Sequence, residues 1–313
     1  MNIFTANNIV KRYATHTALN GVSIEVPQGS VFGLLGPNGA GKTSLIRIIN
    51  QITAPDEGEL FFKGERLQAK HIERIGYLPE ERGLYKKMQL GEQALYLAQL
   101  KGLSENDAKQ KLKYWFEKFE IQSWWKKKIE DLSKGMQQKV QFIISILHEP
   151  ELLILDEPFS GFDPINANLI KNEILELKKK GTTIILSTHN MGSVEELCDY
   201  IALIHQSKKV LDGQVKELRN QYSTNVYDVE FKGNMLLFTN SMWGGFELLS
   251  HKETDGIFKA RVKLINGNSP NSFLKFILEH LEVQSLNEVV PSMNDIFIST
   301  VTGKSIEVSD LTE

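Results

Sequence analysis

The stretch Gly36–Thr43 reads GPNGAGKT, which fits the phosphate-binding pattern G-x-x-x-x-G-K-[ST]. Glycines let backbone N–H groups turn inward around phosphate oxygens, and the helix that follows directs the positive end of its dipole at the same point. Lys42 can then reach the β- and γ-phosphates, and the Thr43 hydroxyl can bind Mg²⁺. Because an apolar, strand-like VFGLL precedes this stretch and a helical pattern follows it, we expect a nucleotide site here.

A second chemical feature is an apolar strand that ends in two acids, LLILDE (Leu152–Glu157). A strand inside a parallel sheet is buried on both faces, so charges are expected only at its carboxyl end, where ligands bind. Successive side chains of a strand point in opposite directions, so we assign Asp156 and Glu157 different roles. Asp156 is predicted to hold Mg²⁺, and Glu157 to polarise the water that attacks the γ-phosphate. The alternative is a strand that simply ends in a solvated acidic turn.

Two further segments bear on the same site. DLSKGMQQ (Asp131–Gln138) opens a helix, and Ser133 and Gly135 offer a hydroxyl and free N–H groups at its N-terminus, where anions bind. Taken alone, Ser133 could be an ordinary helix N-cap. His189 follows the strand-like TTIILST and is expected near the carboxyl edge of the sheet, although a single histidine there could equally serve packing or capping.

Taken in order, GPNGAGKT, DLSKGMQQ, LLILDEPFSGFD and STH resemble the nucleotide-binding subunit of ABC (ATP-binding cassette) transporters over about residues 1–220. The resemblance implies that His189 senses the γ-phosphate and that Tyr13 stacks on adenine. It implies that Ser133 and Gly135 contact the nucleotide. It also assigns ATP binding to the phosphate loop: Gly36, Pro37, Asn38, Gly39, Ala40, Gly41, Lys42, Thr43 and Ser44.

The same resemblance implies an arrangement of two chains. Each ATP would lie between the phosphate loop of one copy and DLSKG of a second copy or a paralogue, so Ser133 and Gly135 would act in trans. The chain would then hydrolyse ATP to power a separately encoded integral membrane permease, with a preference for export. One alternative is a soluble ABC ATPase that acts on ribosomes or DNA; another is a small-molecule kinase.

The chain departs from the family pattern in two places. LSKGM stands where the family commonly has LSGGQ, but Ser133 and the second glycine are kept. In LPEERGLY (Leu78–Tyr85), Glu80 takes the position of a glutamine that contacts Mg²⁺ in the family. A carboxylate can also offer an oxygen, so we count Glu80 among the metal ligands; the alternative is a surface glutamate unconnected to the metal.

The order of patterns predicts an α/β fold in two domains, which suits a chain of 313 residues. Residues 1–220 are expected to form a P-loop ABC nucleotide-binding domain with a mixed sheet core and an α-helical subdomain at about 83–150. In the N-terminal strands, NG and PQG are interpreted as turns. Residues 221–313 are expected to form a small α+β domain, similar to the accessory domain of exporter-type ABC ATPases related to sodium-extruding subunits.

Composition limits the remaining choices. Lys and Arg number 36 against 39 acidic residues, a net charge of −3, which argues against a nucleic-acid partner. The single cysteine, Cys198, excludes a disulfide framework. The sequence has no apolar run long enough to cross a membrane and no pattern of a signal peptide at its start. We therefore expect a cytoplasmic protein, peripheral on the inner face of the cell membrane through its permease.

Overall fold

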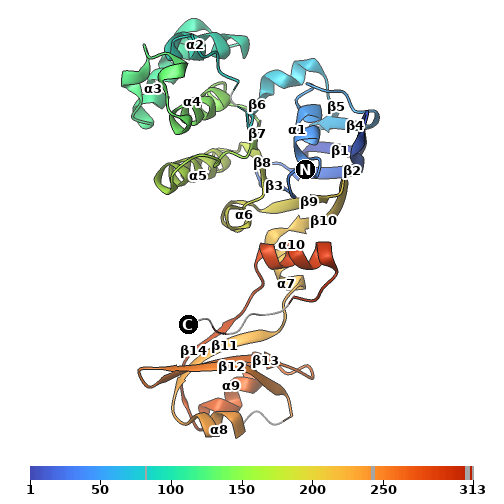
Figure 1. The fold of residues 1–313 in the computed structure, drawn as a ribbon, viewed down its shortest axis with the longest axis vertical. Coiled ribbons are helices and arrows are strands. Elements are labelled where there is room, and N and C mark those ends of the chain that lie inside the picture. The colour runs from blue at the N-terminus through green and yellow to red at the C-terminus, as the bar shows by residue number, and fades with distance from the viewer. Residues whose placement is uncertain (82, 241–243, 307–310, 312–313) are drawn as a thin grey trace. The chain divides into compact units, whose positions relative to one another are not determined.

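The computed structural model describes residues 1–81, 83–240, 244–306 and 311. The chain divides into two compact units, Met1–Val215 and Lys216–Glu313, and each is described here by itself (Figure 1). This division falls a few residues before the boundary expected after residue 220. Residue 82, within the Glu80 segment, lies outside the described residues.

A six-stranded sheet positions the chemistry in the first unit. Its order is β10-β9-β3-β8-β7-β6, and all neighbours are parallel except β10 and β9. The strands are β3 (Val31–Leu35), β6 (Ile75–Leu78), β7 (Leu152–Asp156), β8 (Thr183–Thr188), β9 (Tyr200–His205) and β10 (Lys208–Gln214). Every residue of β3, β7 and β8 is buried, so polar groups gather where these strands end, at one edge of the sheet.

A second, antiparallel sheet has the order β2-β1-β4-β5. Its strands are β1 (Asn2–Tyr13), β2 (His16–Pro27), β4 (Glu57–Phe62) and β5 (Glu65–Arg66). Helix α1 (Lys42–Ile49) buries its apolar side chains in a core cluster shared by both sheets. The predicted turn at Asn20–Gly21 is wrong: these residues lie inside β2, where the pairing shifts between Ile9–Val22 and Lys11–Leu19. A positive φ at Gly21 fits this bulge.

Helices α2 (Leu90–Leu100), α3 (Glu105–Lys118) and α4 (Lys134–Ile146) lie together as the expected helical subdomain (Figure 1). The unit also contains α5 (Pro164–Lys179), α6 (Met191–Leu197) and short 3₁₀ turns at Ala69–Arg74, Gln122–Trp124 and Ile129–Asp131. Helix α5 begins with Pro164 in its first turn, and the Asp163 carboxylate accepts a hydrogen bond from the Asn166 amide, as is typical of a helix N-terminus.

The second unit is an antiparallel sheet of order β12-β13-β11-β14, with a core built around Phe231, Phe238 and Phe273. Its strands are β11 (Val226–Lys232), β12 (Phe246–Thr254), β13 (Ile257–Leu264) and β14 (Glu282–Glu288). Its helices are α8 (Met235–Asn240), α9 (Pro270–Leu278) and α10 (Met293–Thr302), and α7 (Val215–Gln221) spans the division between the units. Both the predicted mixed-sheet core and the small α+β domain are confirmed. Among the described residues, no helix is both long and apolar enough to cross a bilayer.

Candidate nucleotide site

A cavity of about 220 Å³ opens at the carboxyl edge of the central sheet. It brings together the phosphate loop after β3, the two acids at the end of β7 and the segment after β6. The residues that line it are His16, Ala18, Asn38, Gly39, Gly41, Lys42, Thr43, Ser44, Glu80, Asp156 and Glu157. Glu80 is exposed but faces the same cavity as Thr43 and Asp156.

The phosphate loop needs glycine at two positions. Gly36 and Gly41 have φ of 143° and 117°, in the region that favours glycine. A Cβ at Gly36 would lie 2.1 Å from the carbonyl oxygen of Ile204, and one at Gly41 would lie 2.3 Å from that of Ala18. Glycine at these two positions therefore lets the loop backbone pack directly against the backbone of β9 and β2, and this contact fixes the tight turn that a phosphate loop needs.

Other residues of the phosphate loop hold its turn in place. The Ala40 amide donates a hydrogen bond to the Pro37 carbonyl at 3.1 Å, and the Ala40 side chain is buried. Most of the predicted loop residues, such as Asn38 and Ser44, line the cavity. The described lining does not include Gly36, Pro37 and Ala40. The loop thus separates into residues that face the cavity and residues that fix its turn.

Lys42 lies buried at the start of α1. Its Nζ donates hydrogen bonds to the carbonyl oxygens of Gly36, at 2.6 Å, and Pro37, at 3.2 Å. Burial lowers the pKa of Lys42, although the carboxylates of Glu157, Asp156 and Glu80 oppose this shift. The ammonium is therefore held on the loop that would surround the β- and γ-phosphates.

Thr43 and Asp156 bring two oxygen donors together in the cavity. The Thr43 hydroxyl donates to Asp156 Oδ2 at 3.4 Å, and Asp156 is only 2% exposed. Burial raises the pKa of Asp156, and the nearby carboxylates of Glu80 and Glu157 raise it further. A divalent cation among these oxygens would relieve that repulsion, so the donor set fits Mg²⁺.

Glu157 is fixed by the neighbouring strand. Its φ of 48° lies in the left-handed region, and its amide donates to the Ser187 carbonyl at 2.9 Å. The Thr188 hydroxyl donates to Oε2 at 3.2 Å, and His189 Nδ1 lies 2.6 Å from Oε1. His189 thus joins the site through its contact with Glu157, and it lies at the strand end as predicted. Asp156 contacts Thr43, whereas Glu157 contacts Thr188 and His189, so the two acids have separate partners.

Tyr13 lies beside the cavity at the end of β1. Its ring centroid is 5.5 Å from that of His16, its partner across the β1–β2 hairpin, and the tyrosine is 39% exposed. Among the described residues that line the cavity, His16 is included and Tyr13 is not. The two rings can nevertheless form one surface for a planar base.

Ser133 and Gly135 lie on the helical subdomain. Ser133 is exposed and caps α4, accepting a hydrogen bond from the Met136 amide at 3.3 Å. Gly135 faces the Gly161–Phe162 turn of its own chain. Neither residue is among the described residues that line the cavity.

Comparison with known proteins identifies the family. The profile described as "ABC transporter" matches residues 19–160, and "ATP-binding protein DrrA1-3-like, C-terminal domain" matches residues 213–301. The chain is 38% identical over 300 residues to the ABC transporter ATP-binding protein YhaQ of Bacillus subtilis, covering 96% of this chain and 98% of YhaQ. The chain belongs to the ATP-binding proteins of ABC transporters.

Other relatives agree with this assignment. The linearmycin resistance ATP-binding protein LnrL of Bacillus subtilis is 35% identical over 216 residues, covering 68% of this chain and 70% of LnrL. A solved ATP-binding subunit of an ABC transporter is 30% identical with a TM-score of 0.66, covering 70% of this chain and 93% of that one. The predicted family, its ATPase activity and its exporter-type C-terminal domain are confirmed, and the small-molecule kinase alternative is excluded.

Sequence reasoning missed two parts of this ABC ATPase site. His16 and Ala18 line the cavity from β2, and the only signal was their closeness to Tyr13. The second omission is the Gln138 amide, which is buried and donates to the Pro158 carbonyl at 3.0 Å. This bond ties α4 to the turn after Glu157, and nothing in the sequence pattern indicates it.

Proposed function

We propose that this ABC ATPase hydrolyses Mg²⁺-bound ATP between two chains and powers a separately encoded integral membrane permease for export. The observation that carries the proposal is that the phosphate loop and the N-terminus of α4, two features that can bind phosphate, lie apart in one chain. Lys42 and Asp156 share one cavity, whereas Ser133 is exposed on α4 outside it. A second chain, either another copy or a paralogue, can supply Ser133 and Gly135 to the open side of the cavity.

Each residue has a role that its position supports. The loop amides and Lys42 bind the β- and γ-phosphates, and Tyr13 and His16 support the adenine. Thr43, Asp156 and Glu80 are the oxygen donors for Mg²⁺, which supplies positive charge to the phosphates.

Glu157 and His189 carry the hydrolytic step in this proposal. The Glu157 carboxylate accepts a proton from the attacking water, and His189 holds that carboxylate in position. Because proton transfer needs the carboxylate within hydrogen-bond reach of the water, its orientation matters as much as its charge.

The export direction rests on relatives. LnrL is named as a linearmycin resistance protein, and SrtF of Streptococcus pyogenes, 33% identical over 205 residues, is named as a lantibiotic transport protein. Through a permease the chain would work at the inner face of the cell membrane. Co-expression with its genomic neighbours tests this: we expect co-purification with a polytopic membrane protein, and recovery with ribosomes or DNA alone would favour the soluble alternative.

Mixing two inactive variants tests the shared site directly. In a dimer of Lys42→Ala with Ser133→Ala, one site keeps the native Lys42 of one chain and the native Ser133 of the other. If the two residues act in trans, mixing the variants restores ATP hydrolysis to roughly a quarter of the native rate, as random pairing of a two-fold dimer requires. A mixture as inactive as the separate variants would mean that Ser133 acts within its own chain.

A further inference from the structure

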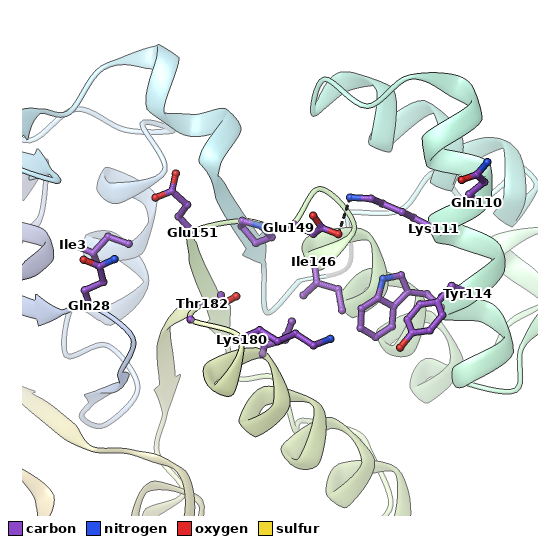
Figure 2. Close-up of a pocket in the computed structure, with 14 residues that line it drawn as sticks. Ile3, Gln28, Gln110, Lys111, Tyr114, Ile146, Glu149, Glu151, Lys180 and Thr182 are labelled. Atoms are coloured by element: carbon purple, nitrogen blue, oxygen red, sulfur yellow. Dashed lines mark ion pairs between the residues drawn. The ribbon is translucent and has the colours of Figure 1, made fainter.

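We propose that a second cleft in the first unit binds a small carboxylate with a flat, apolar body. The cleft has a volume of about 650 Å³, within the range usual for small-molecule sites (Figure 2). It lies at the amino-terminal edge of the central sheet, because Glu151 directly precedes β7 and Thr182 directly precedes β8. The nucleotide cavity is at the opposite ends of these strands, and the described linings share no residue.

The apolar part of the cleft comes from α3 and from buried residues behind it. Tyr114 and Trp115 are neighbours with ring centroids 5.3 Å apart and an interplanar angle of 76°. Trp115 is 8% exposed, whereas Tyr114 is 53% exposed and offers its ring to a ligand. Ile146 and Leu177 are buried and complete this wall. A planar apolar group can therefore pack against the Tyr114 ring.

Both carboxylates of the lining already have cationic partners. Glu149 Oε1 lies 2.9 Å from Lys111 Nζ, an ion pair drawn in Figure 2. Glu151 forms ion pairs with Lys63 and Arg74, which approach it from outside the lining. Since each acid already has a cationic partner, neither is an unpaired charge that would attract a cationic ligand.

Lys180 leaves a positive charge in the cleft. Within the described parts of the chain, its ammonium takes part in no hydrogen bond or ion pair, and nearby Glu176 pairs with Lys179 at 2.7 Å. Figure 2 shows the Lys180 side chain extending from the end of α5 toward the α3 side, where Tyr114 stands. Thr182 adds a hydroxyl to the same lining.

These groups define the class of ligand. A single ammonium and a hydroxyl suit one carboxylate, whereas a polyphosphate is usually held by a backbone cradle or by arginine forks. The aromatic ring and the apolar wall suit a flat body attached to that carboxylate. The site would thus take an amphiphilic aromatic acid, and not a second nucleotide.

Calorimetric titration of the full chain with 1-naphthylacetate, without nucleotide, tests the proposal. We expect one site per chain with a Kd below about 1 mM, and binding of the uncharged 1-naphthylacetamide that is at least about tenfold weaker. Lys180→Gln should weaken 1-naphthylacetate binding by about tenfold or more, equivalent to about 1.4 kcal/mol. Lys113→Gln is the matched control, because Lys113 is exposed on α3 beside Tyr114 and lies outside the described lining, and it should bind like the native chain.

Tyr114→Ala separates the apolar contribution, and its exposed position keeps the variant folded. It should weaken both naphthyl compounds. The proposal is overturned if no saturable binding occurs, if Lys180→Gln binds as tightly as the native chain, or if the acid and the amide bind equally. None of these outcomes depends on ATP hydrolysis, so failure here is distinct from failure of the proposed transport function.

Discussion

His189 Nδ1 lies 2.6 Å from Glu157 Oε1, so the loop after β8 holds the residue that follows β7. The Thr188 hydroxyl binds the other carboxylate oxygen at 3.2 Å. Both oxygens of Glu157 are therefore oriented by one short segment. Since Glu157 has a φ of 48°, its backbone is also held in a conformation that few non-glycine residues adopt.

We predict that His189→Ala reduces ATP turnover by at least about tenfold, or about 1.4 kcal/mol of activation free energy. The substitution frees one oxygen of Glu157 and so weakens the orientation of the carboxylate toward the attacking water. Because the phosphate loop is unchanged, ATP affinity should change by less than about threefold. Phosphate-release kinetics and an equilibrium measurement of ATP binding distinguish the two effects.

His251→Ala is the control for this experiment, because His251 is an exposed histidine of β12 in the second unit. It should leave turnover at the native level. Native turnover in His189→Ala would contradict the positioning role.

Glu157→Gln should reduce turnover by at least about a hundredfold, because an amide cannot accept the proton of the attacking water. ATP binding should persist, since the amide keeps the size of the side chain. If ATP closes two chains around the nucleotide, the variant should elute as a stable dimer in size-exclusion chromatography with ATP. The double variant with Lys42→Ala is the control and should remain monomeric, as should Glu157→Gln without ATP; a monomer with bound ATP would count heavily against a shared site.

Glu80→Gln should keep ATP hydrolysis within about tenfold of the native rate. The amide retains an oxygen that faces the same cavity as Thr43 and Asp156, and the substitution removes one negative charge. Turnover is measured as a function of Mg²⁺ concentration. Glu81→Gln, the exposed neighbour outside the described lining, is the matched control and should not change the Mg²⁺ dependence. A near-total loss in Glu80→Gln would give this carboxylate a specific role that an amide cannot replace.

Local patterns predicted the elements of the site well. Gly36–Thr43 turns from β3 into α1, Asp156 ends β7, and Ser133 caps α4, because strand burial, glycine geometry and capping are short-range properties. The Asn20–Gly21 turn was wrong because a bulge within a long strand and a turn share the same residue types.

Contacts between residues that are far apart in the sequence could not be predicted as well. Glu80 reaches the cavity because β6 pairs with β7, and His16 reaches it because β2 approaches the phosphate loop at Gly41. Neither pairing leaves a local pattern in the sequence. The cleft beside Lys180 depends likewise on where the fold places α3 relative to the starts of β7 and β8.

Gly41→Ala should abolish nucleotide binding and lower the thermal unfolding midpoint. Its φ is 117°, and an added Cβ would lie 2.3 Å from the backbone oxygen of Ala18, which cannot move without disturbing β2. Gly39→Ala is the matched control, because Gly39 also has positive φ but has nothing within 4 Å of an added Cβ. It should fold with a loss of only about 1–2 kcal/mol, the usual cost of an alanine at positive φ. Equal loss of stability in both variants would show that backbone conformation, and not the close approach, dominates.

Asp156→Asn should stabilise the chain in the absence of Mg²⁺ and ATP while removing Mg²⁺-dependent turnover. Burial, with Glu80 and Glu157 nearby, raises the pKa of Asp156 in the folded state, so its ionisation opposes folding. This penalty to the free energy of folding is absent below the unfolded-state pKa of about 3.9. It grows as the pH rises from there to the raised pKa of the folded state, and it is constant at higher pH. The thermal midpoint of Asp156→Asn should exceed the native one by about 2–4 °C at pH 8, where about 1 kcal/mol produces such a shift, and the difference should vanish toward pH 4.

Asp163→Asn is the control of opposite sign, because hydrogen bonds from Asn166 lower the pKa of Asp163, and its midpoint should not rise at pH 8. If Asp156→Asn is no more stable than the native chain at pH 8, the buried carboxylate does not carry the electrostatic strain that a bound cation would relieve.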